Sequence, residues 1–315
     1  MFAFMHIPKN QLQNLIDHRK AVSMNGLQDI ELHDIIEEGD FLSAEDFLRT
    51  YRKLMEDSNN SNFGLHFGCF LNIKALGFVT FIQKSTHNFE QAIKLIQDYL
   101  DESFPLVSLE VQIKSDQLLL ILSSNIHDDD ELSLHILDTV FAFIYREVKL
   151  LLPPEISFNA ILPYKSLHEY EGLLKNDCRY GPRHSFQFNT NPIKTPINKK
   201  TSVQIEYLLP KYLQLLEEST AEPNKFSRKV KIATLSMCSP EVPTLDQVLT
   251  QFPLSKRSFQ RRLAKENSSF RDIVNGIKRK LYEYLAMGEG FKVQDIAFIL
   301  GYSDPSAFLH AKSNW

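Results

Sequence analysis

The segment that most constrains the fold is Val293–Phe308, which reads as two short helices around a tight turn. Ile296 and Ala297 supply the apolar core of the first helix, and Gly301 follows where a left-handed residue is favoured. The dipeptide Asp304-Pro305 then offers a helix cap and a proline suited to the first turn. This order predicts a helix-turn-helix, a motif whose second helix enters the DNA major groove.

The second helix of this segment has two predicted faces. Tyr302 is expected to fold back over the turn. Three small or aromatic side chains are expected to point inward: Ala307, Phe308 and Ala311. The predicted DNA-contacting residues of this unit are Ser303, Ser306, Leu309 and His310.

A second unit of the same kind precedes it at Thr244–Leu263. Thr244 and Gln247 have the spacing of a capping box, in which each side chain accepts a backbone amide of the other residue. Phe252-Pro253-Leu254 reads as the turn, and Ser255 as the cap of the following helix. Phe259 and Leu263 lie four positions apart and are expected to face the core.

The opposite face of that helix carries the residue types that read bases. Arginine donates two hydrogen bonds to guanine, and glutamine pairs in the same way with adenine. Lys256 and Arg262 are of a type better suited to phosphates. The predicted contacts are Ser255, Lys256, Arg257, Gln260, Arg261 and Arg262. The alternative is an ordinary capped helix pair with a basic face.

A spacer helix is predicted between the two units, from Phe270 to Ala286. Its apolar side is formed by Ile273, Val274, Ile277, Leu281 and Leu285. If the spacer is rigid, the two recognition helices are expected to lie about one duplex turn apart, in successive major grooves.

The charge is divided unevenly along the 315 residues, a length that suggests two domains. From residue 223 onward there are 15 Lys and Arg against 8 Asp and Glu, a net charge of +7. Residues 1–222 hold 20 against 31, a net charge of −11. A basic module behind an acidic one is typical of a DNA-binding domain with a separate sensor domain, although a solvated basic face is the alternative.

Compartment and redox state are expected to be those of the cytoplasm. No apolar run reaches the roughly 18 residues of a membrane helix. The first nine residues lack the features of a signal peptide. Cys69, Cys178 and Cys238 are odd in number and without metal spacing, so buried, reduced thiols are expected.

The first domain is predicted to be α+β, because helical and strand periodicities interleave without a βαβ rhythm. The expected helices are Leu42–Met55, Phe89–Leu100, His135–Leu152, Leu167–Leu174 and Val203–Glu217. The expected strands are the hairpin Val107–Ile113 and Leu118–Leu122, with Ser115-Asp116 as its turn, then Ile156–Leu162 and Ser185–Phe188. The long apolar helix and the hairpin are candidates to line a ligand pocket, but core packing explains them equally well.

These patterns divide the chain into three parts. Residues 1–218 form an α+β ligand-binding or dimerisation domain. Residues 219–228, polar and broken by Pro223, form a linker. Residues 229–315 form an all-α domain with two helix-turn-helix units joined by a linker helix.

With these motifs, residues 225–315 resemble the DNA-binding domain of the AraC/XylS family of bacterial transcriptional regulators. The resemblance rests on Leu254–Leu263 and on Ile296-Ala297, Gly301–Phe308 and Trp315. The first domain resembles, more weakly, the arabinose-binding-type sensor domain of one branch, through Leu42–Met55, Phe63–Gly68 and Ile156–Asn189. The resemblance implies a sequence-specific activator that binds double-stranded promoter DNA, with RNA polymerase, a small-molecule effector and a second copy of the chain as partners.

The chain also departs from the family pattern. Lys312 stands where the family has a core phenylalanine, and Tyr282 where it has alanine. A buried, unpaired lysine is costly, so its side chain is expected to reach outward and leave the helix end loose. The family's closing helix is not present after Trp315, so the domain is expected to be C-terminally truncated relative to the family.

No residue is predicted to be catalytic, and no cofactor, metal or membrane is expected as a partner. His127–Glu131 reads as a polar loop, and His66 and His87 lack ligand spacing. Two alternatives stay open. One is a sensor or interaction protein with a degenerate DNA-binding domain. The other is an enzyme fused to that domain, as in repair proteins that use cysteine-bound zinc.

Overall fold

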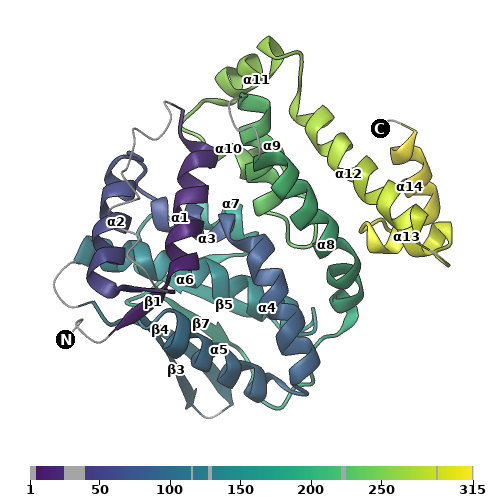
Figure 1. The fold of residues 1–315 in the computed structure, drawn as a ribbon. Coiled ribbons are helices and arrows are strands. Elements are labelled where there is room, and N and C mark those ends of the chain that lie inside the picture. Colours follow the sequence, from purple (N-terminus) through teal and green to yellow (C-terminus); the bar gives the residue numbers. More distant parts are fainter. Residues whose placement is uncertain are drawn as a thin grey trace. The chain divides into compact units, whose positions relative to one another are not determined.

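The computed structural model describes residues 5–24, 40–114, 116–126, 130–220, 225–288, 290–313 and 315. The chain forms two compact units (Figure 1). The first unit comprises the residues up to Leu71 together with Ile82–Asn198, and the second comprises Asn72–Phe81 together with Lys199–Trp315. Ser115 of the predicted turn, positions 127–129 of the predicted polar loop and positions 221–224 of the predicted linker lie outside the described residues.

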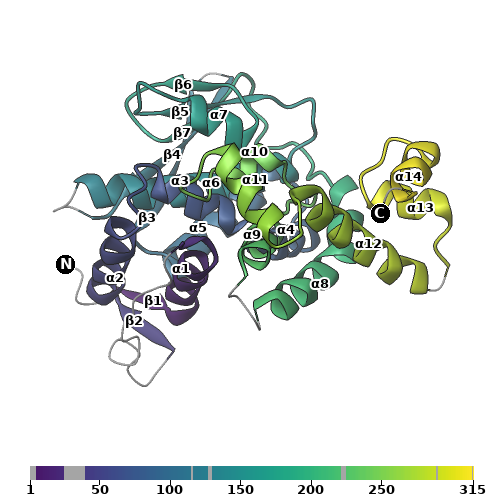
Figure 2. The ribbon, with the colours of Figure 1, turned by 90° about the horizontal axis from the view of Figure 1, so that it is seen from above.

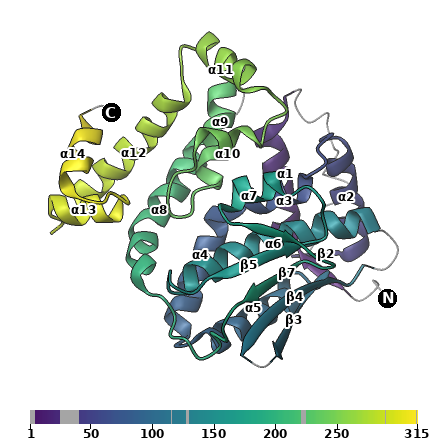
Figure 3. The ribbon, with the colours of Figure 1, turned by 180° about the vertical axis from the view of Figure 1, so that it is seen from behind.

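A five-stranded sheet organises the first unit (Figure 3). Its strand order is β3-β4-β7-β5-β6, and all neighbours are antiparallel except the parallel pair β5 and β6. The strands are β3 (Val107–Lys114), β4 (Gln117–Ser124), β5 (Phe158–Leu162), β6 (Cys178–Tyr180) and β7 (Ser185–Phe188). A separate two-stranded sheet pairs β1 (His6–Pro8) with β2 (Phe41–Ser43). The predicted α+β fold of this part is confirmed.

The predicted hairpin is β3 and β4, paired from Val107 opposite Ser124 to Lys114 opposite Gln117. Successive side chains of a strand point to opposite faces of the sheet, and Leu109, Leu120 and Leu122 lie on the face that is buried in the core. The outer end of β3 is less covered, because Ile113 is 51% exposed.

Among the described residues of the first unit there are six complete helices, and a seventh begins in the second unit and ends in the first. They are α1 (Lys9–Val22), α2 (Ala44–Glu56), α3 (Phe63–Phe70), α5 (Phe89–Ser103), α6 (Asp130–Leu151), α7 (His168–Leu174) and the shared α4 (Asn72–Ser85). Helix α2 is capped by Ser43, whose hydroxyl accepts the Asp46 amide at 3.1 Å. Helices α1, α3 and α4 were not predicted from the sequence.

Two glycines allow α3 to pack directly against α6. A Cβ atom on Gly64 would lie 1.9 Å from the carbonyl oxygen of His135, and one on Gly68 would lie 2.5 Å from that of Thr139. The close approach is held by the Thr139 hydroxyl, which contacts the Gly64 carbonyl at 3.1 Å. The spacing of four residues puts both glycines on one face of α3, so the helix backbones meet there.

The apolar side of the sheet packs against aromatic residues of α6. The Phe141 and Phe186 rings stack with their centroids 4.4 Å apart, and Phe158 meets Phe186 edge-on at 5.8 Å. Phe141 and Phe186 are both fully buried. The long apolar helix predicted at His135–Leu152 is therefore part of the core.

The second unit is helical (Figure 2). Besides part of α4 it contains α8 (Lys200–Thr220), α9 (Phe226–Ser236), α10 (Leu245–Leu249), α11 (Lys256–Lys265), α12 (Phe270–Met287), α13 (Val293–Ile299) and α14 (Pro305–Lys312). The predicted spacer is α12, and four of its five predicted apolar residues are buried, namely Ile273, Ile277, Leu281 and Leu285. Val274 is only half-buried.

Helix α8 belongs to this second unit, although the sequence placed it at the end of the first domain. It packs along α9, α12 and α13. The buried Tyr212 hydroxyl donates to the Pro240 carbonyl at 2.8 Å, and Tyr207 meets Phe291 edge-on at 4.8 Å. Helix α9 begins at Phe226, inside the segment predicted as linker.

No single helix among the described residues is long and apolar enough to cross a membrane, and only the bent pair α3 and α4, at 56°, passes by length and composition together. All eight residues of α3 are buried in the fold.

Cys69, Cys178 and Cys238 are free and buried, as predicted. Burial raises the pKa of the Cys69 and Cys178 thiols to about 12, so both stay protonated.

Candidate DNA interface

The helix pair α10–α11 is built from local signals in its sequence. The predicted capping box is present: the Thr244 hydroxyl accepts the Gln247 amide at 3.4 Å, and the Gln247 side chain accepts the Thr244 amide at 3.1 Å. Helix α11 begins after Ser255, whose hydroxyl accepts the Ser258 amide at 3.3 Å. These caps satisfy backbone groups that a helix start leaves unpaired.

An aromatic cluster fixes the rotation of α11. Phe259 and Leu263 are buried, as predicted. The Phe259 ring meets Phe226 edge-on at 5.3 Å and Phe252 at 5.5 Å. Because these contacts hold one side of α11 against α9 and the turn, the opposite side faces solvent.

The exposed side of α11 carries all the predicted cations. Within the described part of the chain, the side chains of Arg257, Gln260 and Arg261 form no hydrogen bond or ion pair. Their side-chain donors are therefore available to a ligand. Lys256 pairs with Asp246 on α10, with Nζ 2.9 Å from the carboxylate. The Arg262 guanidinium lies 5.9 Å from the centre of the Phe226 ring. Sequence reasoning missed both partners, since each contact joins residues from different helices.

The second pair, α13–α14, has the predicted turn. Gly301 has a φ of +78°, the left-handed value that favours glycine. The Tyr302 amide donates to the Ala297 carbonyl at 2.9 Å. The Asp304 carboxylate accepts the Ala307 amide at 2.8 Å, and this hydrogen bond lowers the pKa of Asp304. The carboxylate therefore stays charged at the positive end of α14.

Helix α14 buries a narrower stripe than the sequence predicted. Phe308 is fully buried and Ala311 half-buried, but Ala307 is exposed, so its predicted inward position is wrong. The helix contacts the rest of the unit along one line of residues, and Ala307 lies about 100° away from Phe308 around the axis. The predicted outward residues Ser303, Ser306, Leu309 and His310 are all exposed.

Lys312 does not reach outward as predicted. Its side chain is half-buried, and its Nζ lies 4.0 Å from the centre of the Tyr282 ring, toward the hydroxyl end. The ammonium also donates to the Tyr282 hydroxyl at 2.6 Å. Helix α14 continues through Lys312, and the Ser313 amide donates to the Leu309 carbonyl. Lys312 and Tyr282, both singled out in the sequence, are therefore in contact.

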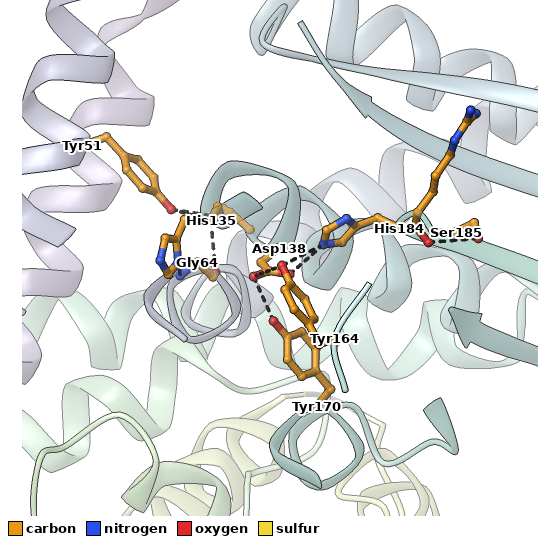
Figure 4. A network of polar contacts seen from close by, with 10 residues as sticks. Tyr51, Gly64, His135, Asp138, Tyr164, Tyr170, His184 and Ser185 are labelled. Atoms are coloured by element: carbon orange, nitrogen blue, oxygen red, sulfur yellow. Dashed lines mark hydrogen bonds and ion pairs between the residues drawn. The ribbon is translucent and has the colours of Figure 1, made fainter. Parts of the chain in front are cut away.

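The first unit contains a buried polar network that the sequence did not predict (Figure 4). Asp138 on α6 accepts hydrogen bonds from Tyr164 at 3.0 Å, Tyr170 at 2.9 Å and His184 at 2.8 Å. Desolvation, followed by the Asp138 charge, raises the pKa of both tyrosines, so they remain donors. Asp138 is at least 26 positions from each of its three partners, so no local sequence pattern predicts these contacts.

A second polar pair anchors the other side of α7. His66 Nε2 lies 2.6 Å from Glu169, and the histidine hydrogen bond lowers the pKa of that carboxyl. Tyr170, the next residue, bonds to Asp138. Among the described residues no cluster of three or more His, Cys, Asp or Glu side chains is arranged to hold a metal ion. The two networks link α3, α6, α7 and His184, the residue before β7.

Three comparisons with known proteins bear on the identity of the chain. Residues 27–197 match the family described as the N-terminal arabinose-binding domain of AraC transcription regulators. A segment of 73 residues is 33% identical to an uncharacterized HTH-type transcriptional regulator of Mycobacterium tuberculosis, and a segment of 75 residues is 31% identical to the HTH-type regulator VqsM of Pseudomonas aeruginosa.

These relatives are matched over a small part of their length. The matches cover 23% and 24% of this chain, and 21% and 23% of the two relatives. The crystal structure of the transcriptional regulator CdpR from Pseudomonas aeruginosa aligns over 97% of this chain and 94% of that one, with a TM-score of 0.43 and 18% identity. The family match spans more than half of the chain. The chain therefore belongs to the AraC family of transcription regulators.

Proposed function

We propose that the second unit binds double-stranded promoter DNA sequence-specifically, with α11 and α14 as its two recognition helices. The observation that carries the proposal is the face of α11. There Arg257, Gln260 and Arg261 are exposed and make no hydrogen bond within the described residues. These are the side chains that pair with guanine and adenine edges in the major groove.

The remaining predicted contacts take supporting roles in the proposal. Ser255 and Ser303 lie at helix starts, where hydroxyl and backbone donors meet phosphates. Lys256 and Arg262 contact phosphates, and the exposed pair between Lys256 and Asp246 contributes only about 0–1 kcal/mol, so DNA can displace it. Ser306, Leu309 and His310 provide the base-facing side of α14.

The first unit acts in this proposal as the sensor. A small molecule bound there, or a second copy of the chain, changes the balance between two DNA-binding states. RNA polymerase at the promoter then responds to the DNA-bound form. A ligand can shift such a balance only by the difference between its affinities for the two states. The family match of residues 27–197 supports a sensor role.

The full-length chain is tested by titrating a labelled duplex from the region upstream of its own gene, and a scrambled duplex, at two salt concentrations. Sequence-specific binding predicts at least a thousandfold preference, roughly the lower end for specific regulators. It also predicts an affinity that falls steeply with salt, because cations released from phosphates accompany binding. Equal affinity for both duplexes contradicts the proposal. So does a slope of log affinity against log salt concentration that corresponds to only a few phosphate contacts.

The alternative is an interaction protein with a degenerate DNA-binding domain, which a lysine in a core position suggests. The contact of Lys312 with Tyr282 argues against this alternative, because the lysine has a partner. Hydrogen exchange separates the two hypotheses: strong protection of the α14 amides supports a folded second pair, and fast exchange throughout α13 and α14 favours the degenerate domain.

A further inference from the structure

The end of α14 is joined to α12 by a contact between Lys312 and Tyr282. Lys312 Nζ lies 4.0 Å from the centre of the Tyr282 ring and 2.6 Å from its hydroxyl oxygen. Both side chains are half-buried. Within the described residues, Lys312 has no carboxylate partner, so the tyrosine provides the stabilisation of its charge.

Aromatic rings complete the contact. Tyr282 lies 5.8 Å from Phe308 and 6.1 Å from Trp315, and Phe308 lies 5.8 Å from Trp315, all between ring centroids. The Trp315 amide also donates to the Lys312 carbonyl at 3.2 Å. The α12 side of the cluster is thus a tyrosine, and the α14 side is a phenylalanine, a lysine and the tryptophan that follows the helix.

A lysine ammonium close to an aromatic ring is stabilised by the negative charge of the ring system, and more strongly where water is partly excluded. Here the ammonium also donates a hydrogen bond to the hydroxyl of the same ring. At a half-buried site, loss of this interaction corresponds to roughly a 3- to 10-fold change in the equilibrium between the docked and the released end of α14. An ammonium engaged in this way has its charge directed at the ring. A lysine that binds DNA phosphate needs the same charge to face the duplex.

We propose that Tyr282 and Lys312 act as one latch, which fixes the second half of α14 on α12 and thereby sets the position of its exposed face. Lys312 is then a positioning residue and not a phosphate contact. The effect on DNA rests on the proposed function, whereas the effect on α14 itself does not.

The latch is tested first in the free, full-length protein. Trp315 is the single tryptophan of the chain, so its fluorescence reports on this cluster alone. Lys312→Met removes the charge and keeps the length, and Lys312→Arg keeps a charged donor next to the Tyr282 ring and its hydroxyl. The matched control is Lys280→Met on α12, whose ammonium is paired with Glu283 at 3.3 Å, away from the rings.

The latch predicts a red shift of Trp315 emission and stronger acrylamide quenching in Lys312→Met. Lys312→Arg and Lys280→Met keep the wild-type spectrum. In a Tyr282→Leu background, Lys312→Met produces no further change, because the partner is already gone. An unchanged spectrum in Lys312→Met, or a full additional shift in the double variant, overturns the latch. Should Tyr282→Leu fold poorly, Tyr282→Phe takes its place in the test. This variant keeps the ring and loses the hydroxyl, so we expect an emission spectrum between those of the wild type and Lys312→Met.

Footprinting on the specific duplex then separates positioning from phosphate contact. Lys312→Met and Tyr282→Leu each weaken protection of the segment next to α14 by roughly 3- to 10-fold, and their double variant loses no more. The slope of affinity against salt stays unchanged, whereas the loss of one phosphate contact lowers it by about 0.9. A lowered slope overturns the positioning role. A wild-type chain that binds no DNA refutes the proposed function, and the fluorescence result then decides the latch alone.

Discussion

Glu147 lies on α6 with no exposed surface, and among the described residues neither of its carboxylate oxygens has a hydrogen-bond partner. Desolvation raises the pKa of this carboxyl well above its ordinary value of 4.5. The folded state therefore holds a proton that the unfolded chain releases as the pH rises. Consequently the free energy of unfolding falls between 4.5 and the raised pKa.

Glu147→Gln keeps the shape of the side chain and removes its titration. We expect this variant to match the wild type near pH 4, and to exceed its free energy of unfolding increasingly as the pH rises toward neutrality. Each pH unit within the window contributes about 1.4 kcal/mol. Urea unfolding of both proteins at several pH values measures the difference. A constant difference across the range would mean that Glu147 ionises as an ordinary carboxylate does.

Base reading on α11 is also a property of single residues. Arg257→Ala or Arg261→Ala is expected to cost about 1–3 kcal/mol at one or two base positions of the DNA site, because a two-pronged contact to guanine is lost. Lys256→Ala is expected instead to weaken binding to every sequence and to flatten the salt slope. Binding to a panel of single-base variants of the site measures the pattern.

Arg183→Ala is the matched control for these variants, since Arg183 is an exposed arginine of the first unit. It should leave the pattern of base preferences unchanged. Should Arg257→Ala, Arg261→Ala and Lys256→Ala all lose affinity equally for every duplex, none of the three reads a base.

At the scale of elements, the contact between α3 and α6 depends on Gly64. Gly64→Ala places a methyl group where the His135 carbonyl oxygen already lies, so the helices must separate. We expect a loss of about 1–3 kcal/mol or more, the usual cost of overpacking. Gly77→Ala is the control on α4, because a Cβ atom there meets no atom within 4 Å.

That control is expected to be neutral or to raise stability by about 0.5–1 kcal/mol, since alanine favours a helix interior over glycine. Thermal unfolding of the two variants shows the contrast. Equal melting temperatures for Gly64→Ala and Gly77→Ala would contradict the direct backbone packing of α3 on α6.

The elements also show what local sequence can predict. The starts of α10, α11 and α14 were predictable from their capping residues Thr244, Ser255 and Asp304, because a capping side chain acts within three residues of its own position. The hairpin β3–β4 was predictable for the same reason, since its strands are joined by a short turn. Contacts between distant residues were not predictable. Lys312 and Tyr282, like Asp138 and His184, meet only because the tertiary fold brings their elements together.

At the scale of the whole molecule, the compact units do not follow the predicted division at residue 218. The second unit takes α8 and Asn72–Phe81, and Asn72 donates to the Met237 carbonyl at 3.2 Å. Polar Pro- and Ser-containing segments predict where a chain bends, but packing decides which unit a helix joins. The face of the candidate site on α11 was predictable from helical spacing, whereas the partners of Lys256 and Arg262 were not.

The central claim is that α11 and α14 together read one DNA sequence, and selection from a random-sequence duplex pool by the full-length chain tests it most directly. The account predicts enrichment of a site with two conserved blocks about one helical turn apart. It also predicts that Arg257→Ala and Arg261→Ala change the preferred bases in one block only. Recovery of no enriched sequence, or of the same sequence with both variants, would contradict the account.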